Sequence, residues 1–190
     1  MIDELQVGAT MPCANCTITY IEAGLEYPNG SYANANTSMW LHHILLINLA
    51  HGDTVCGKNY YGKGQRWFAS GNERVPADIA RNGTMKVGYY IGTGDINIML
   101  VELMNQATVN QTAVATITYE YIPGMPTDFY SATPLWLDIA GCDIASDMPA
   151  KSNTSFSYTA PNYVANFTGA VTDAIGHLHD GLVSVLDTVR

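Results

Sequence analysis

The sequence predicts an all-β protein with a jelly-roll β-sandwich fold, built as two sandwiches in tandem of which the second is incomplete. Its apolar segments alternate with polar residues or run continuously with β-branched and aromatic residues, and helical periodicity is almost absent. Glycine, proline and Asn-Gly separate these segments. Short strands at this spacing are typical of sandwiches and barrels.

The first half of the chain contains the clearer strands. Residues 17–21 alternate and lead into a turn at 28–31, Pro-Asn-Gly-Ser. Residues 40–49 form a continuous apolar run that carries two histidines, which predicts a long buried strand. Residues 86–91 predict a further strand.

A hairpin is predicted after that strand. The tetrapeptide at 92–95, Gly-Thr-Gly-Asp, has turn composition, and an apolar strand returns at 96–104. Residues 116–121 alternate cleanly between two faces. One of these faces is expected to carry Ile117, Tyr119 and Tyr121.

Proline and glycine at 123–126, Pro-Gly-Met-Pro, mark a boundary between two modules. The first β-sandwich is expected over residues 1–125, and the start of the second over residues 130–190. About seven or eight strands are needed to close a sandwich, so the second module is either an extension of the first sheet or an incomplete domain. Its expected strands lie at 135–139, 155–158, 166–171 and from residue 182.

Composition excludes several classes of partner. The chain has 17 acidic residues against 8 basic ones, a formal charge of −9, and no stripe of Lys and Arg, so it is a poor partner for nucleic acid. No apolar run approaches the roughly 18 residues of a membrane span. The acidic start, Met1 to Leu5, lacks an apolar signal core, so no signal peptide is expected within the sequence.

Cysteines and glycosylation motifs favour a secreted glycoprotein. Four cysteines form only one C-x-x-C pair, which favours structural disulfides over a zinc or redox site and leaves three pairings open. The N-x-S/T pattern occurs seven times, and N-linked glycans would keep a surface with few charges soluble. Disulfides are expected at Cys13, Cys16, Cys56 and Cys142, and glycans at Asn15, Asn29, Asn36, Asn82, Asn110, Asn153 and Asn166.

Two histidine pairs are the candidate metal ligands. His177 and His179 are two residues apart, so on a strand both imidazoles share a face and chelate one ion; the alternative is an exposed glycine-rich turn. His42 and His43 are adjacent, so they reach one metal only if the strand bulges. The alternative there is a hydrogen-bonded core histidine beside a surface one. The sequence contains no serine or cysteine nucleophile motif.

The order of these motifs resembles the copper type II, ascorbate-dependent monooxygenases, the family of the peptidylglycine α-hydroxylating and dopamine β-hydroxylating enzymes. Residues 41–46, Leu-His-His-Ile-Leu-Leu, are similar to the first copper strand, and 175–179, Ile-Gly-His-Leu-His, lie where the second begins. Segments 66–72 and 87–91 are similar to an aromatic turn and strand between them. The whole chain is also similar to a group of secreted fungal proteins with these motifs.

The resemblance implies a two-copper enzyme that hydroxylates C–H bonds of a small-molecule or peptide substrate with dioxygen, and takes electrons from ascorbate. The first copper would bind His42 and His43, and Met104 stands where the family has a third histidine. A thioether favours Cu(I); the alternative role of Met104 is core packing. The second copper would bind His177 and His179, which we expect to form the tighter Cu(II) site. The alternative function is a non-catalytic copper-binding or structural cell-surface glycoprotein of the same fold.

Overall fold

A computed structural model of the chain describes residues 2–139 except 58–63, and then 141–142, 151 and 154–177. Within these residues the only helix is the single 3-10 turn η1 (Ala35–Thr37), and every other regular element is a β-strand. The predicted all-β fold is confirmed. No helix in the described part of the chain is long and apolar enough to cross a membrane.

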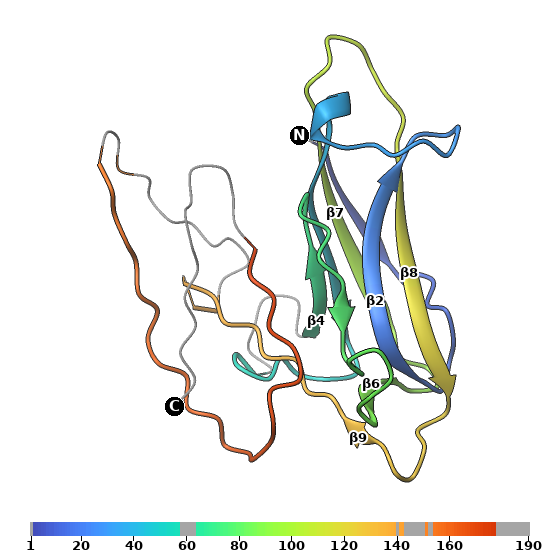
Figure 1. Cartoon of the computed structure of the whole chain (residues 1–190), viewed down its shortest axis with the longest axis vertical. Helices are drawn as coiled ribbons and strands as arrows, with labels where there is room; N and C mark the ends of the chain where they lie inside the picture. Colours follow the sequence, from blue (N-terminus) through green and yellow to red (C-terminus); the bar gives the residue numbers. More distant parts are fainter. Residues whose placement is uncertain (1, 58–63, 140, 143–150, 152–153, 178–190) are drawn as a thin grey trace.

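Two sheets pack face to face as a sandwich (Figure 1). The first sheet has the strand order β1 (Ile2–Val7), β7 (Asn97–Asn105), β3 (Met39–Asn48) and β4 (Gln65–Ser70). The second is centred on β2 (Cys16–Glu26), which pairs on one side with β8 (Val114–Pro123) and on the other with β5 (Ala77–Asp78) and β6 (Val87–Ile91). A short β9 (Tyr130–Ser131) pairs with β6 in parallel. Strands β3 and β7 are therefore central in the first sheet.

One hydrophobic core fills the space between the sheets. Inward residues of β3, such as Leu41 and Ile44, are completely buried against inward residues of β2. Trp67 of β4 stacks on Tyr89 of β6 with ring centroids 4.6 Å apart, and this pair joins the two sheets. Residues that point outward from β3 and β7 consequently lie on the outer face of the first sheet.

The predicted hairpin at 92–95 is wrong. The strand before the turn, β6, belongs to the second sheet, and the strand after it, β7, belongs to the first. The turn itself is present, because Gly94 has φ +88° and the Asp95 carboxylate accepts a hydrogen bond from the Gly92 N–H at 3.0 Å. Turn composition reports only that the chain reverses, so it does not distinguish a hairpin from a crossing between sheets.

Strand β8 follows its prediction in part. Ile117 and Tyr119 pack against the core as expected, whereas Tyr121 is exposed. The pairing of β2 with β8 shifts register between Ile18 and Tyr20, and Tyr121 lies opposite Ile18, just past that irregularity. The alternation of one strand does not reveal a bulge in its partner.

The chain after β9 also differs from the prediction, because 135–139, 155–158 and 166–171 are not strands in the structure. An alternating segment becomes a strand only where a neighbour pairs its backbone groups, and several apolar side chains here, such as Leu137 and Val164, are exposed. The strand expected from residue 182 lies outside the described residues. A second sandwich therefore stays a prediction.

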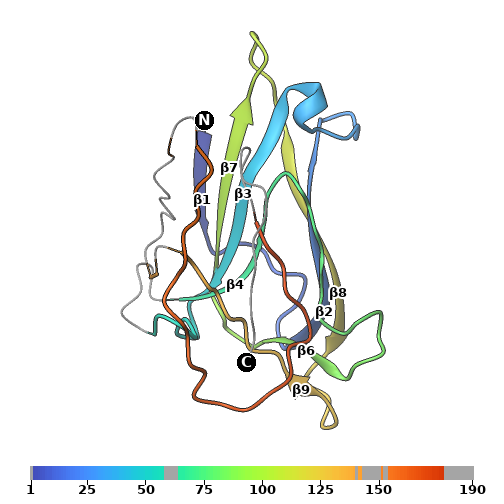
Figure 2. The same ribbon diagram turned by 60° about the vertical axis from the view of Figure 1, so that its left-hand side comes forward.

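The described residues of the C-terminal segment, 132–139, 141–142, 151 and 154–177, run alongside the β4 side of the sandwich (Figures 1 and 2). The disulfide between Cys56 and Cys142 ties it to the loop between β3 and β4. The Arg66 guanidinium of β4 lies 4.8 Å from the centre of the Trp136 ring. The other predicted cysteines form a second disulfide, Cys13–Cys16, so all four are oxidised as expected.

Replacing Leu41 with alanine is expected to destabilise the fold by about 2–5 kcal/mol, because Leu41 is completely buried and its removal leaves a cavity between the sheets. Urea unfolding with the disulfides intact measures this change. Leu5→Ala on the outer face of β1 is the matched control, since Leu5 is 62% exposed and its loss should have little effect. Equal destabilisation by the two variants would contradict the sandwich packing.

Candidate metal centre

A β-bulge at His42 brings both adjacent histidines to one side of the first sheet. In the pairing of β3 with β7, Leu41 lies opposite Leu103, whereas His43 lies opposite Glu102, so β3 contains one extra residue at this point. The flanking residues Leu41 and Ile44 still point into the core and are completely buried. The bulge that the adjacent pair requires is therefore present.

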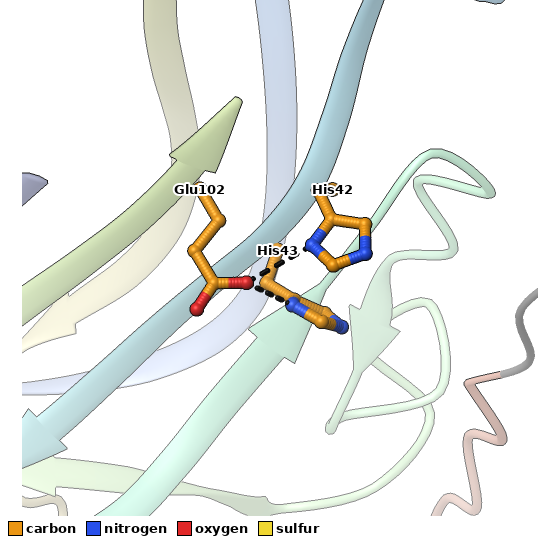
Figure 3. Close-up of side chains that lie close together, drawn as sticks. All are labelled: His42, His43 and Glu102. Atoms are coloured by element: carbon orange, nitrogen blue, oxygen red, sulfur yellow. Dashed lines mark hydrogen bonds and ion pairs between the residues drawn. The ribbon is translucent and has the colours of Figure 1, made fainter. Parts of the chain in front are cut away.

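The carboxylate of Glu102 on β7 holds this pair together (Figure 3). Its Oε2 accepts a hydrogen bond from His42 Nδ1 at 3.0 Å and another from His43 Nδ1. The three side chains are 22–33% exposed, so they are reached by solvent at the outer surface. One ligand atom from each lies within 4.8 Å of the others, which is compact enough to hold a metal ion.

His177 of the C-terminal segment joins the pair from 134 residues away in the sequence. Its Nε2 lies 3.0 Å from Nε2 of His43. Its Nδ1 donates a hydrogen bond to Oε1 of Glu73 at 2.9 Å, and the same oxygen accepts from the Gly71 N–H at 3.1 Å. These contacts define a candidate metal centre, called the metal centre below, which consists of His42, His43, Glu73, Glu102 and His177.

The charges of the metal centre are set by burial and by these hydrogen bonds. Burial raises the pKa of Glu102, but the bonds from His43 and His42 outweigh burial and hold that pKa below its usual value. The pKa of Glu73 is likewise lowered, because the bonds from His177 and the backbone outweigh burial. Burial lowers the pKa of His43, which keeps this imidazole neutral near pH 7, the form that binds metals.

The structure brings together three of the five predicted metal ligands. The resemblance implies a separate copper for each histidine pair, and that assignment stays a prediction; in the structure, Nε2 of His177 lies 3.0 Å from Nε2 of His43. Met104 lies on β7 opposite Trp40, two residues beyond Glu102 and on the same face of the strand. His179 lies outside the described residues, and its predicted role stays a prediction.

Sequence reasoning did not identify the two carboxylates. A signal for Glu102 exists, because it is the only charged residue in the apolar stretch 96–104 and alternation places it on the outer face. Glu73 carries no such signal, because it lies in the irregular segment after β4 and meets His177 only through the path of the C-terminal segment.

Gly71→Ala is expected to lower copper affinity without removing a ligand. A Cβ atom at position 71 would lie 2.6 Å from Cε1 of His177 and 2.9 Å from the carbonyl oxygen of His42, so His177 must move. The expected loss is on the order of 10–100-fold, as for other changes that disturb ligand orientation. Competition titration with a copper chelator measures it. Gly169→Ala, where a Cβ meets nothing within 4 Å and the backbone φ is not positive, controls for a glycine change away from the centre. Unchanged affinity in Gly71→Ala would contradict the placement of His177.

Two curated fungal proteins are similar to the chain over most of its length. Probable copper-dependent oxygenase M1 of Phoma sp. is 41% identical over 170 residues, which are 90% of this chain and 43% of that protein. Probable copper-dependent oxygenase clz3 of Cochliobolus lunatus is 40% identical over 161 residues, 85% of this chain and 51% of that protein. No protein-family model and no solved structure matches the chain. The chain is thus homologous to proteins named as probable copper-dependent oxygenases, and it spans about half the length of these curated relatives.

Proposed function

We propose that this chain binds copper at the metal centre and is the copper-binding part of an oxygenase. The observation that carries the proposal is the convergence of His42, His43 and His177 from distant parts of the sequence on one partly exposed point. The names of the two curated relatives support copper as the metal and an oxygenase as the class of enzyme.

The contact between His43 and His177 fits two ligands of one metal ion. Imidazole nitrogens bind such ions at roughly 2.0–2.1 Å, so two neighbouring ligands at near-tetrahedral or right angles stand about 3 Å apart. The two Nε2 atoms are separated by 3.0 Å. Imidazole ligands suit copper. A metal-bound histidine also commonly donates its other ring N–H to a carboxylate, and carboxylates lie next to these histidines.

Copper bound at this point supplies one-electron chemistry with dioxygen. The chain's own residues would bind and orient the metal. The bulge in β3 presents His42 and His43 on one face. Glu73 accepts a hydrogen bond from His177, and the absence of a side chain at Gly71 leaves room for His177 beside them. The imidazoles of His43 and His177 are each 33% exposed, which leaves the centre open to a substrate from the solvent side.

The finer features of the proposal follow the resemblance to the ascorbate-dependent copper monooxygenases. The reaction is hydroxylation of a C–H bond of a small-molecule or peptide substrate, with ascorbate as the reductant. The protein is secreted, which the two disulfides support. N-linked glycosylation is supported by the exposure of the six N-x-S/T asparagines that lie within the described residues. Asn153 lies outside the described residues.

Oxygen consumption tests the proposed function. The copper-loaded chain is expected to consume dioxygen with ascorbate faster than the metal-free chain and faster than a copper-loaded His43→Ala variant. Loading with Zn²⁺, which has no redox chemistry, is the matched control. Full copper uptake with no copper-dependent oxygen consumption would instead assign the chain to the non-catalytic copper-binding proteins.

A further inference from the structure

Each of the three imidazoles in the metal centre has its Nδ1 against a carboxylate oxygen. His42 and His43 share Oε2 of Glu102, and His177 contacts Oε1 of Glu73. A neutral imidazole carries its proton on one nitrogen and a lone pair on the other, and an ionised carboxylate only accepts hydrogen bonds. All three Nδ1 atoms must therefore be protonated, and the neutral form of each imidazole has its lone pair on Nε2.

From this geometry we infer that Glu102 and Glu73 are positioning residues, which hold His42, His43 and His177 in the Nδ1–H tautomer so that the three Nε2 atoms are the metal ligands. The inference rests on the proposed copper site and assigns the roles within it.

The contact between His43 and His177 supports the same assignment. Glu102, His43, His177 and Glu73 contact one another in that order. The carboxylates at both ends of this series are hydrogen-bond acceptors. The two Nδ1–H groups serve these ends, and in the neutral imidazoles the two Nε2 atoms, which lie 3.0 Å apart, both carry lone pairs. Two lone pairs repel at this distance, and a cation between them makes the contact attractive. The short contact between the two Nε2 atoms therefore supports a cation bound at these atoms.

The competing assignment makes Glu102 a ligand beside the Nδ1 atoms of His42 and His43, since these atoms are also close together. That arrangement requires unprotonated Nδ1 atoms at hydrogen-bond distance from an anionic oxygen, and it gives His177 no role. The Nε2 assignment uses all five residues, and it matches the common pattern in which a metal-bound histidine donates its other N–H to a carboxylate.

Tautomers in the metal-free protein provide the first test. Long-range ¹H–¹⁵N NMR of the chain with ¹⁵N-labelled histidine is expected to show protonated Nδ1 on His42, His43 and His177. In Glu102→Ala, His42 and His43 should move to the Nε2–H form that free histidine prefers, while His177 stays unchanged. In the wild-type chain, addition of Cu(I), which is diamagnetic, should move the Nε2 signals and leave the Nδ1–H signals in place.

Copper affinity provides the second test. Glu102→Ala is expected to lose on the order of 10–100-fold in affinity, and Glu73→Ala less, because Glu102 orients two imidazoles and Glu73 one. Glu102→Gln keeps an oxygen that accepts from Nδ1 and should restore most of the loss. Glu120→Ala on β8, in the other sheet, removes the same charge and should change nothing.

Two outcomes would overturn the inference. One is Nε2–H tautomers for His42 and His43 in the metal-free wild-type chain. The other is an equal loss of affinity in Glu102→Gln and Glu102→Ala, which is the result for a carboxylate ligand. If the wild-type chain takes up no copper, the proposed function fails, and the tautomers of the metal-free protein still decide whether Glu102 and Glu73 act as positioning residues.

Discussion

Replacing His43 with alanine is expected to abolish tight copper binding. His43 is the residue through which the two halves of the metal centre meet, because its Nδ1 contacts Glu102 and its Nε2 lies 3.0 Å from His177. The loss should exceed the roughly 10–100-fold that removal of an outer hydrogen-bond partner costs, since a ligand itself is removed. Competition titrations with chelators of Cu(I) and Cu(II) measure the change in both oxidation states.

His51→Ala is the matched control for this variant. His51 lies outside the metal centre, 3.8 Å from Asp95 at its closest nitrogen, and its side chain is 47% exposed. Its removal should leave copper affinity unchanged. A His43→Ala chain that binds copper as tightly as the wild type would show that the ligands lie elsewhere.

Replacing Asp53 with asparagine is expected to lower the free energy of unfolding by about 3–5 kcal/mol, because it breaks a buried ion pair. Asp53 and Arg66 form an ion pair at 2.8 Å, and both side chains are almost completely buried. Asparagine keeps an oxygen for the backbone N–H groups of Val55 and Cys56, which Asp53 accepts at 3.0 and 2.9 Å. The variant therefore isolates the cost of removing the charge of the Asp53 carboxylate from beside the buried Arg66 guanidinium. Guanidinium chloride unfolding with intact disulfides measures it.

The same ion pair predicts a pH dependence of stability. Burial raises the pKa of Asp53, but the hydrogen bonds from Arg66 and the backbone outweigh it, so the pKa in the folded protein lies below the usual 3.8. The unfolded chain thus binds a proton at higher pH than the folded chain does. The stabilisation is complete above about pH 4 and declines as the pH falls through the lower, folded-state pKa. Asp53→Asn should lack this part of the acid dependence.

The exposed ion pair between Lys86 and Asp128 is the control for the buried one. Its two atoms are 2.6 Å apart, but both side chains are more than half exposed, so water and salt screen the attraction. Asp128→Asn should leave the free energy of unfolding nearly unchanged. Similar losses in Asp53→Asn and Asp128→Asn would contradict the importance of burial at Asp53.

The strands that could be predicted are those in which one face is apolar or the whole run is apolar, such as β3 and β7. Strand β4 was not predictable in this way, because it begins with Gln65 and Arg66, polar residues that are nevertheless buried. Their burial depends on partners elsewhere in the chain: Gln65 accepts a hydrogen bond from Tyr89, and Arg66 pairs with Asp53. A pattern of hydrophobicity does not contain such partners.

The metal centre was predictable where it depends on neighbours in the sequence and not where it depends on the path of the chain. Two adjacent histidines on a strand can bind one metal only if the strand bulges, and a bulge is found at His42. The meeting of His43 with His177 depends instead on where the segment after β9 returns to the sheet. Two motifs of one sequence can form two sites or share one, and their spacing along the chain does not distinguish these arrangements.

Copper stoichiometry tests most directly the claim that the two histidine motifs form one centre. The chain is loaded with copper, separated from unbound metal by gel filtration and analysed for metal content, alongside His42→Ala and His177→Ala. One centre predicts one copper ion per wild-type chain and loss of that same ion in each variant. Two copper ions per wild-type chain, with one retained in each variant, would contradict the account and restore two separate sites.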